Sequence, residues 1–128
     1  MSFKEETLLK AMDVVQSFYS EWLYDPKVDI YRAKDIANAL TSTQWESKEW
    51  ATEMIVHHSK PGESMLVMGG WYGLLSGLLK ENRRNPESVD LDPMCKVLGK
   101  RLFPRVQFHT DDAYEFFMAR RNDFSFRS

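Results

Sequence analysis

The chain has 128 residues, of which 43% are hydrophobic and 13% aromatic. This length suits one hydrophobic core, and the apolar content predicts a folded chain in which residues 1–128 form a single domain. A formal net charge of −2 disfavours a general polyanion binder, although local basic clusters keep nucleic acid open as a partner. The single cysteine excludes an intrachain disulfide, and no apolar run approaches the ~20 residues of a membrane span. We therefore expect a cytoplasmic protein without membrane association.

Residues 1–60 are predicted to form about three helices. Apolar residues keep helical spacing from Lys4 to Trp22, and Asp25–Pro26 marks or follows the end of that helix because proline disfavours helical geometry in the residue before it. A weaker helical pattern covers residues 30–40. Thr43-Gln44-Trp45-Glu46 has the form of a capping box, which predicts the start of a third helix. The side chains expected on its buried face are Trp45, Trp50, Met54 and Ile55.

Residues 61–128 are predicted to alternate strands and helices. Met65–Met68 is a short apolar run, typical of a parallel strand covered on both faces, and a helix with leucines along one face follows it. Ser88–Asp92 and Val106–Thr110 are predicted as two further strands, each followed by a helix. The order βαβαβα predicts an α/β fold with a Rossmann-like parallel sheet and right-handed crossovers.

A glycine-rich turn joins the first predicted strand to its helix. Gly69, Gly70 and Gly73 are suited to positive φ or to close backbone approach, and the helix that follows presents unpaired amide groups at its start. The spacing matches neither the G-x-G-x-x-G dinucleotide fingerprint nor a P-loop, which requires a lysine. Trp71 and Tyr72 within the turn are either core aromatics or ligand-facing side chains. The turn is a candidate ligand site, or it merely connects two elements.

Carboxylates follow the second and third predicted strands. In a doubly wound sheet, ligands bind outside the carboxyl ends of the strands, so Asp90 and the Asp111–Asp112 pair converge on the glycine turn. A carboxylate after the second strand suits ribose hydroxyls, and one after the third suits an adenine amino group. Alternatively, Asp92 caps a helix that starts at Pro93, and Asp111 or Asp112 caps the next helix.

These motifs resemble those of the class I S-adenosylmethionine-dependent methyltransferases. The strand, the turn and Gly73-Leu74-Leu75-Ser76 resemble the first motif of the family, Val89–Pro93 resembles the second, and Asp111–Ala113 resembles the third. The sequence departs from the family at Val67, where an acidic residue is usual, and at Trp71, where the family has a central glycine. The resemblance implies the cofactor-binding half of that fold.

The resemblance covers about residues 64–117 and implies a site for S-adenosylmethionine, an adenosine-type ligand, with Asp90 at the ribose and Asp112 at the adenine. No catalytic residue is assigned, because methyl transfer depends mainly on aligning the nucleophile, the methyl group and the sulfur. The residues assigned to the cofactor are Gly69, Gly70, Trp71, Tyr72, Gly73, Asp90, Leu91, Asp111, Asp112 and Ala113.

Two other kinds of site are disfavoured. His57–His58 and His109 are poor candidates for a metal site, because adjacent histidines on a helix point in different directions and no cysteine or acidic partner has suitable spacing. Cys95 paired with His109 would resemble a nucleophile and its base, but Cys95 lies on the apolar side of a predicted helix. That position is typical of a small buried thiol.

The chain is shorter than the family fold, which continues with a fourth strand and an acceptor-binding segment. Only Phe124-Ser125-Phe126 is a candidate for such a strand. The open edge of Met65–Met68 therefore predicts a homo-oligomer. Two functions remain: a methyltransferase-like protein acting on an unidentified acceptor, or a catalytically inactive interaction or oligomerisation module. An unrelated flavodoxin-like or nucleotide-binding protein is a third alternative.

Overall fold

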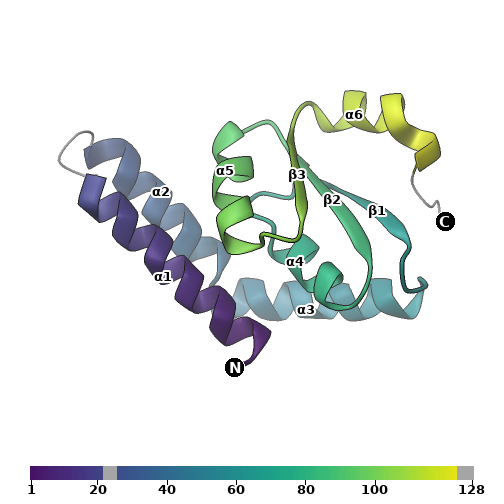
Figure 1. Ribbon diagram of the computed structural model, residues 1–128, viewed down its shortest axis with the longest axis horizontal. Coiled ribbons are helices and arrows are strands. Elements are labelled where there is room, and N and C mark those ends of the chain that lie inside the picture. The colour runs from purple at the N-terminus through teal and green to yellow at the C-terminus, as the bar shows by residue number, and fades with distance from the viewer. Residues whose placement is uncertain (22–25, 124–128) are drawn as a thin grey trace.

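A computed structural model describes residues 1–21 and 26–123 (Figure 1). The helices are α1 (Phe3–Glu21), α2 (Pro26–Ala39), α3 (Ser42–His57), α4 (Leu74–Glu81), α5 (Pro93–Leu102) and α6 (Ala113–Arg120), followed by a 3-10 turn, η1 (Arg121–Asp123). The strands are β1 (Ser64–Met68), β2 (Asn85–Asp90) and β3 (Gln107–Thr110). They pair in parallel in the order β1-β2-β3, which confirms the predicted βαβαβα order and the Rossmann-like class.

The three predicted N-terminal helices are present. α1 and α2 pack against each other, α1 also contacts α5, and α3 packs against α4 (Figure 1). α2 begins at Pro26, earlier than expected, because proline fits the first turn of a helix, where its missing amide proton has no partner to lose. Among the described residues, no helix is long and apolar enough to cross a membrane. The candidate strand at Phe124–Phe126 lies outside the described residues.

The start and the buried face of α3 differ from the prediction. Its N-cap is Thr41, whose hydroxyl accepts a hydrogen bond from the Gln44 amide at 3.4 Å, so the predicted start at Thr43 was two residues late. Trp45 is buried as expected, but Trp50 is 66% exposed and Met54 is 45% exposed. At 3.6 residues per turn, these two side chains lie about 140° and 180° around the helix from Trp45, so the prediction of their burial was wrong.

β2 begins at Asn85, three residues before the predicted start, and ends at Asp90 instead of Asp92. Asn85 and Pro86 read as part of a polar connection, but they pair in register with the first two residues of β1. The next residue, Glu87, is polar and faces inward, and it is paired with His109 and Arg120. Tertiary partners therefore stabilise a strand whose composition is typical of a loop.

The two faces of the sheet have separate apolar clusters. Ser88 pairs with Phe108 and Val89 pairs with His109, so Phe108 and Val89 point to opposite faces. Phe108 belongs to the large cluster that α1, α2, α3, α4 and α5 complete. Val89 belongs to a small cluster with Phe116 of α6. α4 and α5 therefore cover one face of the sheet, and α6 covers the other.

Close approach of the helices to Phe108 requires glycine at two positions. A Cβ atom at Gly73, the N-cap of α4, or at Gly99, within α5, would lie 2.4 Å from the Phe108 ring. This is far inside van der Waals contact, so any larger residue would push the helix or the ring aside. The packing fixes the start of α4, and with it the glycine turn, against the sheet.

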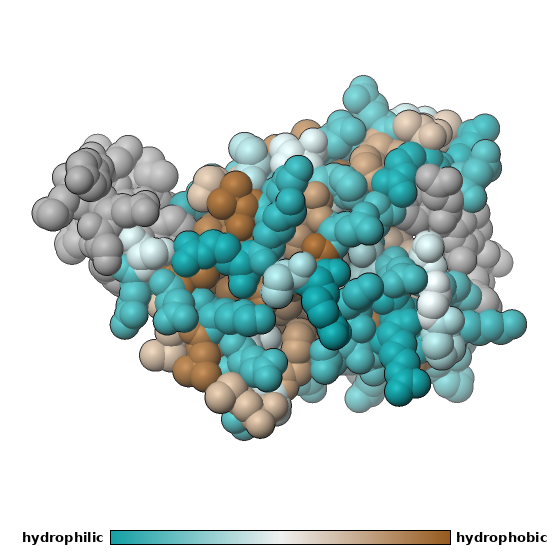
Figure 2. Space-filling view, viewed as in Figure 1, coloured by the Kyte–Doolittle hydropathy of each residue, from teal (hydrophilic) through white to brown (hydrophobic). Residues whose placement is uncertain are grey.

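The N-terminal helices leave apolar side chains at the surface. On the face shown in Figure 2, hydrophobic residues appear among hydrophilic ones at the α1–α2 end. α1 buries Thr7, Ala11 and Val14, whereas Leu9 is 48% exposed and Met12 is 59% exposed. A groove of about 540 Å³ runs along α1 and α2 and is lined mostly by apolar side chains. The apolar stripe of α1 is therefore only partly buried by the described residues.

Candidate functional site

The turn between β1 and α4 has left-handed backbone at three positions. The φ angles are 61° at Gly69, 49° at Trp71 and 92° at Gly73. Glycine adopts such angles at little cost, whereas a bulky residue does so with strain. Trp71 stands where the resemblance implies a glycine, and its φ of 49° is one that glycine adopts more readily than tryptophan does. The turn is therefore left-handed at Trp71 although the side chain is bulky.

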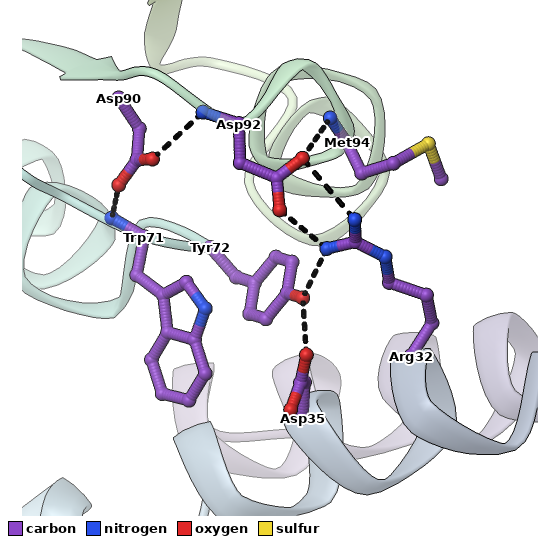
Figure 3. Close-up of polar contacts among 7 residues, drawn as sticks. All are labelled: Arg32, Asp35, Trp71, Tyr72, Asp90, Asp92 and Met94. Atoms are coloured by element: carbon purple, nitrogen blue, oxygen red, sulfur yellow. Dashed lines mark hydrogen bonds and ion pairs between the residues drawn. The ribbon is translucent and has the colours of Figure 1, made fainter. Parts of the chain in front are cut away.

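Asp90, at the end of β2, holds this turn (Figure 3). Its Oδ2 accepts a hydrogen bond from the Trp71 amide at 3.1 Å, and its Oδ1 accepts one from the Asp92 amide at 3.0 Å. The Gly70 amide donates to the Val89 carbonyl at 3.2 Å, which ties the same two segments together. A carboxylate offers about four acceptor positions, so Asp90 retains capacity to accept hydrogen bonds from a ligand.

Asp92 and Asp112 each cap a helix. Asp92 Oδ1 accepts from the Met94 amide at 3.0 Å, with Pro93 in the first turn of α5. Asp112 Oδ1 accepts from the Glu115 amide at 2.9 Å at the start of α6. The structure confirms the capping interpretation for both residues, and the adenine contact of Asp112 stays a prediction.

The predicted site residues lie at one edge of the sheet. The Asp111 amide donates to the Asp90 carbonyl at 3.2 Å, which joins the ends of β2 and β3. Leu91 follows Asp90 and is 70% exposed, and Ala113 is the half-buried first residue of α6. This is the carboxyl edge of the parallel strands, where α/β proteins bind their ligands.

A polar cluster that the sequence did not predict connects α2 to the turn (Figure 3). Arg32 donates to both carboxylate oxygens of Asp92 and, at 3.3 Å, to the Tyr72 hydroxyl, which donates in turn to Asp35 at 3.4 Å. The hydrogen bond from Arg32 holds the pKa of Asp92 below its ordinary value, and burial raises the pKa of Tyr72. Tyr72 is 2% exposed, which makes it a core aromatic with a polar tip.

A cavity of about 260 Å³ lies between the glycine turn and the N-terminal helices. Residues 67–75 and Phe103 form one wall, and the opposite wall consists of Ala39, Leu40, Gln44 and Lys48. Trp71 is 38% exposed, and its ring centroid lies 5.0 Å from that of Tyr72. The cavity therefore adds two polar residues of α3 to the candidate site. No local sequence signal marked them, because only the docking of α3 brings them to the turn.

Among the residues that it describes, the structure gives no support to the thiol nucleophile or to the metal site that the sequence disfavoured. Cys95 is buried, and its burial raises the pKa of the thiol to about 12, so it is protonated and unreactive at neutral pH. His109 Nε2 lies 2.9 Å from Glu87, away from any thiol contact. Within residues 1–21 and 26–123, no group of three or more His, Cys, Asp and Glu side chains is placed to hold a metal ion.

Comparison with solved structures identifies the fold. The chain aligns over 67% of its length with a TehB-like SAM-dependent methyltransferase from Corynebacterium glutamicum, with a TM-score of 0.50 and 22% identity. It aligns over 62% with a SAM-dependent methyltransferase from Agrobacterium tumefaciens, with a TM-score of 0.51 and 16% identity. The chain has a methyltransferase-like fold.

The match covers only part of each structural neighbour. The chain spans 44% of the Corynebacterium protein and 28% of the Agrobacterium protein. No protein-family model matches the sequence, and no curated protein matches it either. The comparisons therefore confirm the predicted resemblance at the level of the fold.

Proposed function

We propose that this chain is the cofactor-binding part of a methyltransferase-like protein and binds S-adenosylmethionine or a related adenosine ligand at the carboxyl edge of its sheet. The observation that carries the proposal is the hydrogen bond from the Trp71 amide to Asp90 within a methyltransferase-like fold. This bond brings the predicted ribose acceptor and the glycine turn into one site.

The residues present suit such a ligand. Asp90 has acceptor capacity for the two neighbouring hydroxyls of a ribose. A Cβ atom at Gly69 would meet nothing within 4 Å, so the backbone of the turn is open to close approach by a ligand. Leu91 offers an exposed apolar side chain beside Asp90, against which the adenine ring of the ligand can pack. S-adenosylmethionine, when bound, supplies an electrophilic methyl group on its sulfonium for an acceptor that is not identified. The chain contributes binding and orientation.

A second candidate is a catalytically inactive interaction or oligomerisation module. One observation favours it. Among residues 1–21 and 26–123, β1 pairs with β2 on one side only, and its other side opens into a groove of about 830 Å³ that contains Met54, Met65 and Leu66. An unpaired strand edge with apolar surroundings is a template for pairing with another chain. Both candidate functions are compatible with the methyltransferase-like fold, so a measurement of ligand binding is needed to distinguish them.

Calorimetric titration with S-adenosylmethionine and S-adenosylhomocysteine tests the proposal. The parent protein is expected to bind both, and Asp90→Ala is expected to weaken binding by about 1–3 kcal/mol through the loss of charge-assisted hydrogen bonds. Asp13→Ala, at an exposed position of α1, is the matched control and is expected to bind as the parent does. A parent that binds neither compound at millimolar concentration contradicts the proposal and leaves the interaction module.

Asp90 also organises the turn, so a ligand pair isolates its contact with ribose. The parent is expected to bind adenosine more tightly than 2′,3′-dideoxyadenosine, which lacks both hydroxyls. Asp90→Ala is expected to bind the two nucleosides with equal affinity. If the variant keeps the full preference for adenosine, Asp90 is not the ribose residue.

A further inference from the structure

The cavity beside the glycine turn is lined by a positive charge and by no negative one among its described residues. Lys48 is the only charged side chain among its described lining residues. Within the described part of the chain, no carboxylate forms an ion pair with the Lys48 ammonium. The opposite wall includes Gly73, Leu74 and Leu75 at the start of α4, where the partial positive charge of helix amide groups gathers. Both walls therefore favour an anionic group.

Gln44 adds a neutral polar group to the same wall. It lies four residues before Lys48 on α3, which places the two side chains on one face of the helix. A glutamine side chain both donates and accepts hydrogen bonds, whereas a lysine ammonium only donates. A carboxylate facing Lys48 and an ammonium facing the Gln44 oxygen would match this pair. The amino-acid end of a ligand carries these two groups on one carbon.

The size of the cavity indicates that it holds one end of a ligand. Its volume of about 260 Å³ lies below the ~300–1,000 Å³ of sites that enclose a whole small molecule. Trp71 lines the cavity, and its amide is bonded to Asp90. The cavity and the Asp90 carboxylate therefore adjoin the same turn, so one ligand can reach both, with its nucleoside part on the exposed edge.

We propose that Lys48, assisted by Gln44, binds the carboxylate at the amino-acid end of the ligand. This inference rests on the proposed function. It means that α3 distinguishes adenosine ligands that carry an amino-acid end from those that lack one. Lys48 is half-buried, so its charge acts across a partly enclosed space where attraction is stronger than in bulk water. Lys48 is a specificity-determining residue, and no role in methyl transfer is assigned to it.

A ligand pair combined with a variant series tests this contact. S-adenosylhomocysteine and 5′-methylthioadenosine share the nucleoside and the thioether, but only the first carries an amino-acid end. Calorimetry on the full chain is expected to show a ~10- to 100-fold loss of S-adenosylhomocysteine affinity in Lys48→Met, the scale of a hydrogen bond to a charged group. Affinity for 5′-methylthioadenosine is expected to stay within about twofold of the parent value, since the contact deleted is absent from that ligand.

Two further variants control the interpretation. Lys34→Met removes an exposed lysine from the neighbouring helix α2 and is expected to leave both affinities unchanged. Lys48→Arg restores a cation and is expected to recover most of the S-adenosylhomocysteine affinity. Thermal unfolding monitored by circular dichroism reports the folded state of each variant.

The outcomes separate the inference from the proposed function. An equal loss for both ligands in Lys48→Met indicates a structural role for Lys48 and overturns the inference, as does an unchanged affinity for both. In these two cases the proposed function stands, because the parent still binds the nucleoside. A parent that binds neither ligand overturns the proposed function and the inference together.

Discussion

The two faces of the sheet are stabilised by different interactions. On the face covered by α4 and α5, Phe108 packs into the large apolar cluster and against helix glycines. On the face covered by α6, the buried apolar pair is Val89 with Phe116, and Glu87 faces the same side. Shape complementarity dominates the first face. The second depends more on charge.

The charged cluster on the α6 face encloses Glu87. This carboxylate accepts two hydrogen bonds from Arg120, at 2.8 and 2.9 Å, and lies 2.9 Å from His109 Nε2. Burial opposes the charge on Glu87, but the hydrogen bonds from Arg120 and His109 outweigh it and keep the pKa of Glu87 below its ordinary value. Arg120 and His109 also lie against the Phe116 ring, at 5.0 and 4.6 Å from its centroid. Electrostatics and aromatic packing are therefore coupled there.

The largest expected effect comes from removing a ring on the tightly packed face. Phe108→Ala is expected to lower the free energy of unfolding by about 3–5 kcal/mol, because the rigid surroundings leave a cavity. Phe116→Ala is the matched variant on the other face, where solvent can fill the gap, and we expect the transfer cost alone, about 1.5–3 kcal/mol. Urea unfolding monitored by circular dichroism measures both. Equal losses would show that the two faces are packed alike.

A smaller effect is expected from the charged cluster, and it depends on pH. Glu87→Gln is expected to lower the free energy of unfolding by about 1.5 kcal/mol at pH 7. The pKa of Glu87 is lower in the folded chain than its ordinary value of 4.5, so the stabilisation is present above that value and is lost as pH falls through the folded pKa. The difference between parent and variant therefore shrinks as the pH is lowered from 4.5.

Urea unfolding at pH 7 and at pH 3 measures this change. Glu115→Gln, at an exposed position of α6, is the control and is expected to differ little from the parent at either pH. If the penalty of Glu87→Gln is the same at both pH values, the charge of Glu87 does not stabilise the α6 face.

The smallest effect on stability is expected at the edge of β1 opposite β2, where self-association is the informative measurement. Met54→Lys places a charge in the groove beside β1, and the free energy of unfolding is expected to change by less than about 0.5 kcal/mol because the side chain is exposed. The homo-oligomer predicted for the parent is expected to be weaker in the variant, which should dissociate at a higher protein concentration than the parent does. Light scattering coupled to size exclusion measures this, with Met118→Lys on α6 as the control. A parent that is monomeric at millimolar concentration contradicts the prediction.

Local patterns predicted the elements around the glycine turn, because an apolar run and regularly spaced leucines are properties of short segments. The position of Asp90 beside the turn followed from the order of the elements. The start of β2 at Asn85 could not be predicted in this way, since pairing with β1 outweighs the polar composition of the segment. Arg32 and Lys48 were missed because the docking of α2 and α3 brings them to the site. The ribose role of Asp90 stays a prediction.

The contact of Phe108 with Gly73 and Gly99 constrains the order in which substitutions can accumulate. A methyl group at position 99 collides with the full ring, whereas it fits after the ring has been replaced by a shorter side chain. A change to alanine at 99 is therefore harmful in one genetic background and acceptable in another, which is epistasis with a steric cause. In evolving descendants of this sequence, positions 99 and 108 should covary, with the aromatic position changing first, whereas the φ of 92° at Gly73 disfavours a side chain there whatever residue stands at 108.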